Sequence, residues 1–460
     1  MQIMNVKRVR RLHFVGIGGA GMSGIAEVVL QNGFDVSGSD MGDNQVIEYL
    51  KNLGIKVYSK HEACNVESAD LVVYSSAIPY DNPELVEART RRIPVIRRAE
   101  MLGELMRLKY TLAIAGTHGK TTTTSIVGQI WEDAGMDPTI IVGGVVKGKG
   151  SGAKVGRGDY LIAESDEFDR SFLSMMPSSA IITNIDADHL DTYENIDEIK
   201  AAFVQFANKI PFYGQAIVCL DDPNVQLILS QIKKPVITYG FTRQAKYRVD
   251  KLVFEKGFPK FEVVADGKNL GAFNLQIPGR HNVLNATAAI ALAVEEGIDI
   301  EIVRKAVASF EGVKRRFEFI GEKNGVMVFD DYAHHPTEAT ATLLGFREAF
   351  PDKRIIVAFQ PHLYTRTRDQ HKAFGSAFAN CDVLLTTDIY ASRERPIEGV
   401  SGALVSDSAS DLGHRDARFI GDQMNLLPIL KNELQSGDVV VLMGAGNIWK
   451  LGTKILEECF

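Results

Sequence analysis

The sequence has 460 residues, of which 45% are hydrophobic and 24% are charged. These fractions are typical of globular proteins and exclude a disordered chain, a collagen-like fibre and a low-complexity polymer. With 51 Lys and Arg against 58 Asp and Glu, the net charge is −7, so we expect no nucleic-acid partner. At roughly 150 residues per domain, the length suggests about three domains.

No apolar stretch reaches the length of about 18 residues that a membrane span needs, so none is expected. The apolar run after the basic segment Lys7–Arg11 is interrupted by glycines and by Glu27, which is unlike a signal peptide. The four cysteines show no metal-binding spacing and indicate free thiols in a reducing compartment, the cytoplasm. They are Cys64, Cys219, Cys381 and Cys459.

Short apolar runs alternate with helical patterns over the first hundred residues. The pattern predicts strands at Leu12–Val15, Asp35–Ser39 and Leu71–Tyr74. It predicts helices at Met22–Gln31, Val46–Leu53, Pro83–Arg91 and Glu100–Lys109. Such alternation favours a parallel sheet with crossover helices, so we expect a Rossmann-like first domain at residues 1–108.

Two further α/β units follow, which gives an α/β protein of three domains. The central domain, expected at 109–316, has predicted strands at Thr111–Ala115, Tyr160–Ala163, Ala180–Thr183 and Ala216–Leu220, and a small antiparallel sheet within 247–277. One predicted helix follows the second glycine-rich loop and ends at Trp131. Two others span Asn282–Glu296 and Ile302–Phe310. The last domain, expected at 317–460 and again Rossmann-like, has predicted strands at Val326–Phe329, Ile355–Phe359, Val383–Thr386 and Val439–Met443.

A first glycine-rich loop lies between the first predicted strand and helix. Gly16, Gly18 and Gly21 fit the pattern G-x-G-x-x-G, in which the backbone can approach a diphosphate at a helix N-terminus. Asp40 ends the next strand, near the place where a ribose-binding acid would lie. The loop alone does not distinguish NAD, FAD and a UDP-sugar.

A second glycine-rich loop reads A-G-T-H-G-K-T-T-T-T from Ala115. It is a variant of the phosphate-binding P-loop, because Ile114 stands where the strict pattern has glycine. Its backbone N–H groups can still surround phosphates, Lys120 can reach the β and γ oxygens, and the Thr121 hydroxyl can bind Mg²⁺.

Acidic residues follow two predicted strands of the same domain. Glu164 ends one strand, and His189 follows another within a run of aspartates. In a parallel sheet these strand ends lie at the edge that also carries the P-loop. A carboxylate and an imidazole there could hold Mg²⁺ beside the phosphates, although a histidine at a strand end often only binds backbone.

These motifs, in their order, resemble those of the ATP-dependent Mur ligases of peptidoglycan synthesis. The shared segments are A-G-T-H-G-K-T-T-T, E-S-D-E-F-D, N-I-D-A-D-H-L-D and G-R-H-N-V-L-N-A-T-A-A. Other segments resemble the member of the family that adds L-alanine. These are H-F-V-G-I-G-G-A-G-M-S-G, I-R-R-A-E-M-L, R-R-F-E, D-D-Y-A-H-H-P-T-E and F-Q-P-H-L-Y-T-R-T-R-D.

The resemblance implies roles for the matching residues. UDP-sugar binding would fall to Gly16, Gly18, Gly19, Gly21, Asp40, Ser75, Ser76 and Ala77. ATP binding would fall to Gly116, Thr117, His118, Gly119, Lys120, Thr121, Thr122, His281, Asn282, Asn285, Arg316 and Asp331. The metal shell would be Thr121, Glu164 and His189, and the incoming amino acid would meet His362, Arg366 and Arg368. The residues taking part in catalysis would be Lys120, Glu164, His189, His334 and Arg366.

The implied reaction joins L-alanine to the lactyl carboxylate of UDP-N-acetylmuramate, with ATP and Mg²⁺ as cofactors and an acyl phosphate as intermediate. Several sibling ligases carry a carbamate-forming lysine where this chain has Phe203. We expect a monomer or a homodimer. Three alternatives stay open. They are a ligase that recycles a whole tripeptide onto the same UDP-sugar, an NAD-dependent oxidoreductase with a regulatory ATPase domain, and a nucleotide-switch or binding protein without synthetic chemistry.

Overall fold

The structure, a computed structural model, describes residues 9–42, 45–75, 77–142, 153–186, 192–255, 257–392 and 394–460. The predictions for Ser76 and His189 fall on positions outside these ranges. The chain divides into two compact units. One comprises the chain up to Asp250 with Glu262–Phe273 and Leu284–Ser309, and the other comprises Lys251–Phe261, Asn274–Val283 and Phe310–Phe460.

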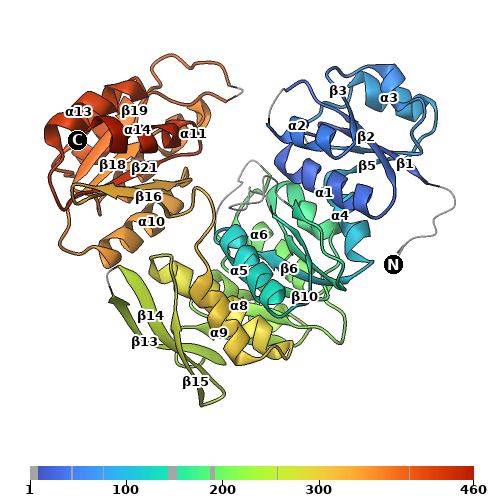
Figure 1. The fold of residues 1–460 in the computed structure, drawn as a ribbon, viewed down its shortest axis with the longest axis horizontal. Helices are drawn as coiled ribbons and strands as arrows, with labels where there is room; N and C mark the ends of the chain where they lie inside the picture. The colour runs from blue at the N-terminus through green and yellow to red at the C-terminus, as the bar shows by residue number, and fades with distance from the viewer. Residues whose placement is uncertain are drawn as a thin grey trace. The chain divides into compact units, whose positions relative to one another are not determined.

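The first sheet has the strand order β3-β2-β1-β4-β5, and its neighbouring strands pair in parallel. Its strands are β1 (Arg11–Val15), β2 (Asp35–Ser39), β3 (Lys56–Tyr58), β4 (Leu71–Tyr74) and β5 (Val95–Arg97). Its helices are α1 (Ala20–Gln31), α2 (Gln45–Asn52), α3 (Pro83–Thr90) and α4 (Arg98–Met106), with a 3₁₀ turn at Ala63–Val66 (Figure 1). The sequence missed β3 and β5, because each has three residues and neither contains a buried one.

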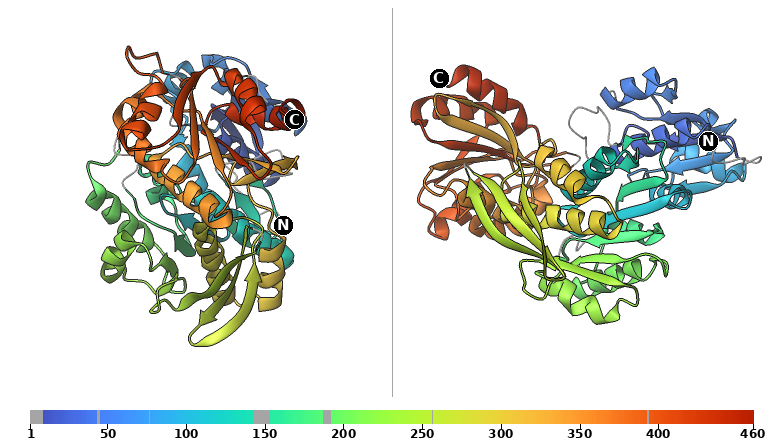
Figure 2. Two further views of the ribbon diagram at one scale, coloured as in Figure 1. Left: turned by 90° about the vertical axis from the view of Figure 1, so that its left-hand side faces the viewer. Right: turned by 60° about the horizontal axis from the view of Figure 1, so that its bottom comes forward.

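The central sheet has the order β15-β14-β13-β12-β11-β10-β6-β9-β7-β8. Its strands are β6 (Tyr110–Ala115), β7 (Thr139–Ile141), β8 (Ala153–Lys154), β9 (Tyr160–Glu164), β10 (Ser179–Ile182), β11 (Ala216–Cys219), β12 (Val236–Gly240), β13 (Tyr247–Glu255), β14 (Phe258–Ala265) and β15 (Lys268–Asn274). The long strands β13 to β15 form the yellow-green edge in Figure 2. Strand β6 lies between β9 and β10 and is parallel to both, so the loop after β6 opens at the middle of the sheet.

The helices of this part are α5 (Lys120–Asp133), α6 (Ile196–Ala207), α7 (Pro223–Ile228), α8 (Arg280–Glu295) and α9 (Ile300–Ser309), with 3₁₀ turns at Phe168–Ser174 (η2) and Leu229–Gln231. Helix α5 carries four consecutive threonines in its first two turns. Two of them, Thr123 and Thr124, are fully buried, and Thr124 donates its hydroxyl proton to the Lys120 carbonyl at 2.8 Å. The helix therefore forms here despite the poor helix propensity of threonine.

The last sheet has the order β16-β17-β21-β18-β19-β20, in which β16 is antiparallel to β17 and the other pairings of the described strands are parallel. Its strands are β16 (Glu318–Lys323), β17 (Val326–Asp331), β18 (Ile355–Phe359), β19 (Val383–Thr387), β20 (Ala417–Gly421) and β21 (Val439–Met443). Its helices are α10 (Pro336–Ala349), α11 (Tyr364–Ala377), α12 (Ala403–Asp411), α13 (Leu426–Glu433) and α14 (Leu451–Glu458). Strands β18, β19 and β21 are buried at every position, as the uninterrupted apolar runs predicted.

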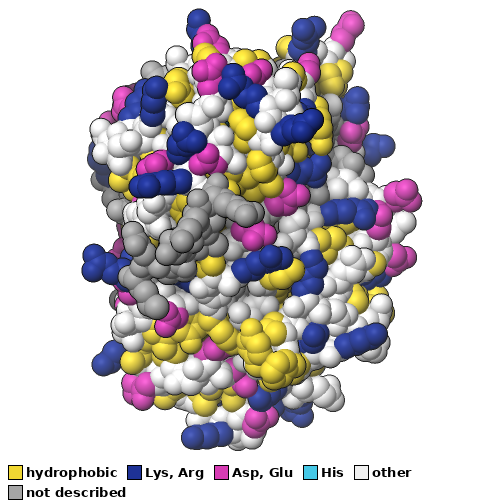
Figure 3. All heavy atoms as spheres, turned by 90° about the vertical axis from the view of Figure 1, so that its right-hand side faces the viewer, with side chains coloured by type: hydrophobic (Ala, Val, Ile, Leu, Met, Phe, Trp, Pro, Cys, Tyr) yellow, Lys and Arg dark blue, Asp and Glu magenta, His cyan; other side chains and the backbone are white. Residues whose placement is uncertain are grey.

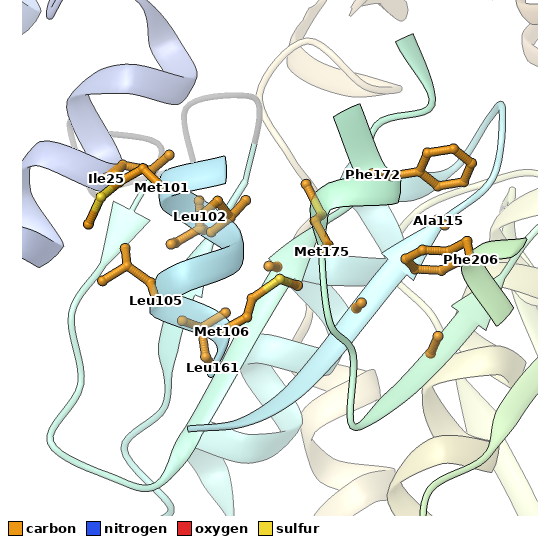
Figure 4. Packing of buried hydrophobic residues seen from close by; sticks show 14 of the residues in the cluster. Ile25, Met101, Leu102, Leu105, Met106, Ala115, Leu161, Phe172, Met175 and Phe206 are labelled. Atoms are coloured by element: carbon orange, nitrogen blue, oxygen red, sulfur yellow. The ribbon is translucent and has the colours of Figure 1, made fainter. Parts of the chain in front are cut away.

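One hydrophobic core joins the first sheet to the central sheet. Helix α4 directs Met101 and Leu102 toward Ile25 of α1, and its Met106 lies near Leu161 of β9 (Figure 4). The backbones come close as well, since a Cβ atom on Gly103 would lie only 2.5 Å from the Ser174 carbonyl oxygen. This packing fixes the first glycine loop and the P-loop within one unit.

Side chains of both charge signs are interspersed over the face shown in Figure 3. Within the described ranges, no helix is both long and apolar enough to cross a bilayer.

Candidate active site

The first glycine loop connects β1 to α1 and is braced by Asp40. Gly16 has a φ of +79°, which favours glycine. The Gly18 N–H donates to Asp40 Oδ2 at 2.8 Å, and the Gly42 N–H donates to Asp40 Oδ1 at 2.8 Å. A Cβ on Gly18 would lie 2.9 Å from that same Oδ2. The Asp40 carboxylate therefore holds the loop by accepting a hydrogen bond from the loop's backbone. The predicted contact of Asp40 with the substrate stays a prediction.

The loop opens where the strand order of the first sheet reverses, between β1 and β4. Ser75 follows β4 and donates its N–H to the Val15 carbonyl at 3.3 Å, so it lies beside the loop. Ala77 is exposed and donates its N–H to Ser75 Oγ at 3.4 Å. A reversal point at the carboxyl ends of parallel strands is the usual position of a nucleotide site in such sheets.

A cavity of about 250 Å³ extends from this loop to the central sheet. Gly19, Gly21 and Ser75 line one part of it, and Glu164 and Asp166 line another. The remaining lining residues are Met22, Arg98, Leu102, Ile141 and Val142. The cavity thus joins the two regions that the sequence assigned to a diphosphate and to a metal-bound phosphate.

The P-loop leaves β6 at Ala115 and enters α5 at Lys120. Gly116 and Gly119 have φ values of +129° and +84°. A Cβ on Gly116 would lie 2.0 Å from Thr183 Oγ1, and one on Gly119 would lie 2.5 Å from Asn285 Oδ1. Both glycines are therefore required by conformation and by space. Asn285 lies against the loop, and its predicted contact with ATP stays a prediction.

The loop is also tied to the end of β10, by hydrogen bonds that the sequence did not predict. Asn184 Oδ1 accepts from the His118 N–H at 2.8 Å, and Thr183 Oγ1 donates to the His118 carbonyl at 2.6 Å. The His118 imidazole lies 3.3 Å from Asp186 Oδ2, and Thr117 Oγ1 accepts from the Asp186 N–H at 2.9 Å. The signal was the polar run that follows the apolar strand.

Lys120 is buried and paired within the protein. Its ammonium donates to the carbonyls of Gly116 at 2.7 Å and Thr117 at 3.1 Å, and to Glu167 Oε2 at 2.7 Å. Burial opposes its charge, but attraction from Glu167 and Asp166 outweighs burial and raises the pKa of Lys120. Lys120 therefore carries its positive charge at neutral pH. Glu167, which is 1% exposed, is a partner that the sequence analysis did not single out.

Thr121 and Glu164 meet at the start of α5. The Thr121 hydroxyl lies 3.0 Å from Glu164 Oε1 and 3.1 Å from Oε2. A hydroxyl and a carboxylate are oxygen ligands of the kind Mg²⁺ prefers, so this pair fits the cation that the family implies. In the described part of the chain no group of three or more His, Cys, Asp or Glu side chains forms a metal cluster. Whether His189 completes the shell stays a prediction.

Phe203, at the position of the carbamate-forming lysine in sibling ligases, belongs to the core. It is fully buried, and its ring centroid lies 5.2 Å from that of Phe172 in an edge-on arrangement.

In the second unit, Asp331 and Arg316 make local contacts. Asp331 is 3% exposed and accepts from the N–H groups of Phe317 at 2.8 Å and Ala333 at 2.9 Å. Burial raises its pKa against the attraction of Arg316. Arg316 in turn pairs with Glu338 at 3.3 Å. Their assignment to ATP stays a prediction, as it does for His281 and for Asn282, whose amide donates to the Pro278 carbonyl at 2.6 Å.

The second unit brings together three of the predicted residues: His334, His362 and Arg366. The rings of His334 and His362 lie 5.9 Å apart, and Arg366 Nη1 donates to the His334 carbonyl at 3.4 Å. His334 Nδ1 lies 3.1 Å from the Tyr332 carbonyl, and burial together with Arg366 lowers the pKa of His334 to about 4. Arg368 is different, because it is exposed and pairs with the adjacent Asp369 at 2.7 Å.

Three family models match the chain in succession. "Mur ligase family, catalytic domain" matches residues 11–110, "Mur ligase middle domain" matches 114–293, and "Mur ligase, glutamate ligase domain" matches 315–446.

Curated relatives match nearly the whole length. A protein of Salinibacter ruber named UDP-N-acetylmuramate--L-alanine ligase is 49% identical over 451 residues, which cover 98% of this chain and 95% of the relative. A protein of Geobacter sp. (strain M21) with the same name is 49% identical, covering 98% of this chain and 97% of the relative.

Solved structures are similar over the same length. The UDP-N-acetylmuramate-alanine ligase of Thermotoga maritima is 31% identical with a TM-score of 0.81, and the match covers 97% of this chain and 98% of that one. A murein peptide ligase of Psychrobacter arcticus, at 23% identity and a TM-score of 0.70 over 98% of both chains, shares the fold.

Proposed function

Because the chain belongs to the Mur ligase family, we propose that it joins L-alanine to the lactyl carboxylate of UDP-N-acetylmuramate at the expense of ATP. The observation that carries this proposal is the cavity shared by the first glycine loop and Glu164. A UDP-sugar held by Gly19 and Gly21 would extend toward the residues that hold the terminal phosphate of ATP. The three consecutive family matches are all to Mur ligase domains, so we reject an NAD-dependent oxidoreductase as the function.

The chemistry starts from the poor electrophilicity of a carboxylate. In the proposed reaction a lactyl carboxylate oxygen attacks the γ-phosphorus of ATP, so that ADP leaves and an acyl phosphate forms. The amine of L-alanine then attacks the acyl carbon, loses a proton, and displaces phosphate as the amide bond forms. Phosphoryl transfer of this kind depends mostly on positioning and on neutralising charge.

Residues of the P-loop are suited to both tasks. The Lys120 ammonium is charged, buried and directed into the loop, where it offsets negative charge on the phosphates. Thr121 and Glu164 would hold Mg²⁺, which when bound neutralises phosphate charge and polarises oxygen. Removing water from the cavity would protect an acyl phosphate from hydrolysis.

We assign the binding of L-alanine to the second unit, at His334, His362 and Arg366. The guanidinium of Arg366 suits a carboxylate such as that of the amino acid or of the muramoyl group. Arg368 is a weaker candidate, since Asp369 already neutralises it. The product would enter the synthesis of peptidoglycan precursors.

The second candidate, a ligase that adds a whole tripeptide, shares the fold and the first two sites. The relatives that are 49% identical carry the name of the L-alanine ligase, which favours the single amino acid. The test is ADP release with UDP-N-acetylmuramate, Mg²⁺ and each of the twenty amino acids in turn, and then with L-alanyl-γ-D-glutamyl-meso-diaminopimelate. Release with L-alanine supports the proposal, and release with the tripeptide alone contradicts it.

A further inference from the structure

Arg98 is a half-buried cation in the cavity of the first unit. It is the first residue of α4, and it lines the cavity together with Gly19, Gly21 and Ser75. Across the described ranges, its guanidinium makes no hydrogen bond and no ion pair. None of the roles derived so far uses it.

The guanidinium lies directly over the glycine loop. A Cβ atom on Gly21 would come within 3.1 Å of Arg98 Nη1 and 3.3 Å of Arg98 Cδ. The last glycine of the G-x-G-x-x-G pattern therefore leaves room for this arginine. The sequence pattern explains that glycine by close packing of a helix on a strand, whereas here the neighbour is a charged side chain from a different helix.

The absence of a partner distinguishes Arg98 from its neighbours. Arg97 donates to the Tyr74 hydroxyl at 3.3 Å, and Arg107, at the other end of α4, pairs with Glu104 at 3.5 Å. The two acids of the cavity are already engaged, Glu164 by Thr121 and Asp166 by Lys120. Burying a charged group that has no partner costs free energy. The half-buried Arg98 guanidinium is therefore suited to bind an anionic group of a ligand.

We propose that Arg98 binds the diphosphate of the UDP-sugar, an inference that rests on the proposed function. The UDP-sugar has two anionic groups that a guanidinium could bind. They are the diphosphate and the lactyl carboxylate. The position of Arg98 over Gly21 assigns it to the diphosphate, because Gly21 lies in the first turn of α1 beside the loop. The planar guanidinium can donate two parallel hydrogen bonds to phosphate oxygens.

The test compares Arg98→Gln with Arg107→Gln, which removes an exposed arginine that directly follows the same helix. Calorimetry measures the affinities for UDP-N-acetylmuramate, UDP-N-acetylglucosamine, uridine and ATP. In Arg98→Gln we expect both UDP-sugars to bind about 10- to 100-fold more weakly, while uridine and ATP bind as in the wild type. Arg98→Lys should recover part of the loss, because it restores the charge without the two-pronged geometry.

Turnover adds a second readout. The KM for UDP-N-acetylmuramate should rise in Arg98→Gln while kcat changes less than about threefold, because the diphosphate is bound equally in the ground and transition states. Unchanged thermal unfolding would show that the variant is folded.

Three results would overturn the proposal. One is a loss confined to UDP-N-acetylmuramate, which would assign Arg98 to the lactyl carboxylate. The second is a loss confined to ATP, and the third is no difference between Arg98→Gln and Arg107→Gln. Failure of the proposed function would look different: wild-type protein would release no ADP with L-alanine, while the two UDP-sugars would still lose affinity in Arg98→Gln.

Discussion

The two glycine loops of the first unit begin alike and obtain their positive charge in different ways. Each follows a parallel strand and opens a helix. The P-loop carries its own cation, Lys120, and the folded protein already pairs that cation with Glu167. The first loop contains no cation, and Arg98 reaches it from α4, about eighty positions along the chain.

The P-loop therefore has its cation within its own segment of the sequence. The first loop obtains a cation only when the chain folds and brings Arg98 to it. In the P-loop, charge and backbone belong to one segment, so binding of a phosphate must compete with Glu167 for Lys120. In the first loop, Asp40 takes up the Gly18 N–H and Arg98 supplies the charge. Variants that act on one loop and spare the other can test this contrast.

The largest expected effect is at the P-loop. Lys120→Ala should lower L-alanine-dependent phosphate release at least about 100-fold, because it removes a preorganised charge at the phosphates. Binding of UDP-N-acetylmuramate should persist. The variant should also be less stable, by about 3–5 kcal/mol, because Glu167 loses its buried partner. The double variant Lys120→Ala/Glu167→Gln should regain stability in thermal unfolding without regaining turnover. Retained turnover in Lys120→Ala would exclude this lysine from the reaction.

A second variant tests the metal pair beside the P-loop. Glu164→Ala should raise the Mg²⁺ concentration for half-maximal activity about 10- to 100-fold, since Thr121 loses the carboxylate that it faces. Asp133→Ala, which removes an exposed carboxylate from the far end of α5, serves as the control. If the Mg²⁺ dependence of activity in both variants matches that of the wild type, the metal is bound elsewhere.

Removing Asp40, which braces the first loop, should have a smaller effect. Asp40→Ala leaves the Gly18 N–H without its acceptor, and a charge-assisted hydrogen bond of this kind is worth about 1.5–3 kcal/mol. We expect the KM for UDP-N-acetylmuramate to rise about tenfold or more, with the KM for ATP unchanged. Asp35→Ala, on the exposed end of the same strand, is the matched control. An equal rise in both KM values would show that the two loops are not independent.

The smallest effect concerns pH and lies in the second unit. The pKa of His334 is lowered from 6.5 to about 4, so the unfolded chain takes up a proton between these values and the folded protein does not. The free energy of unfolding should therefore fall as the pH drops from about 6.5 to about 4, by about 2 kcal/mol from this residue. Urea unfolding at several pH values should show a weaker fall in His334→Gln. Parallel pH curves for the two proteins would contradict the shift.

The sequence predicted the strands that are buried and apolar throughout, such as Ile355–Phe359 and Val439–Met443, with their observed bounds. It missed β3 and β5, whose pairing depends on a neighbouring strand and whose residues remain partly exposed. At the site it predicted the P-loop glycines and the nearness of Thr121 to Glu164, because both depend on short segments at the ends of parallel strands. It did not predict Glu167, Asn184 or Asp186 as partners of the loop, since a polar run after an apolar strand does not indicate which of its side chains contact another segment.

The sequence by itself determined the α/β fold class, both glycine loops and the family, because strand burial and backbone freedom are written into short stretches of residues. Only the tertiary structure decided which charges are neutralised: Lys120 by Glu167, Arg368 by Asp369, and Arg98 by nothing in the described chain. The physical reason is that electrostatic pairing depends on distances of a few ångströms between side chains. Those distances are set by how helices and strands pack, and a linear pattern does not contain them.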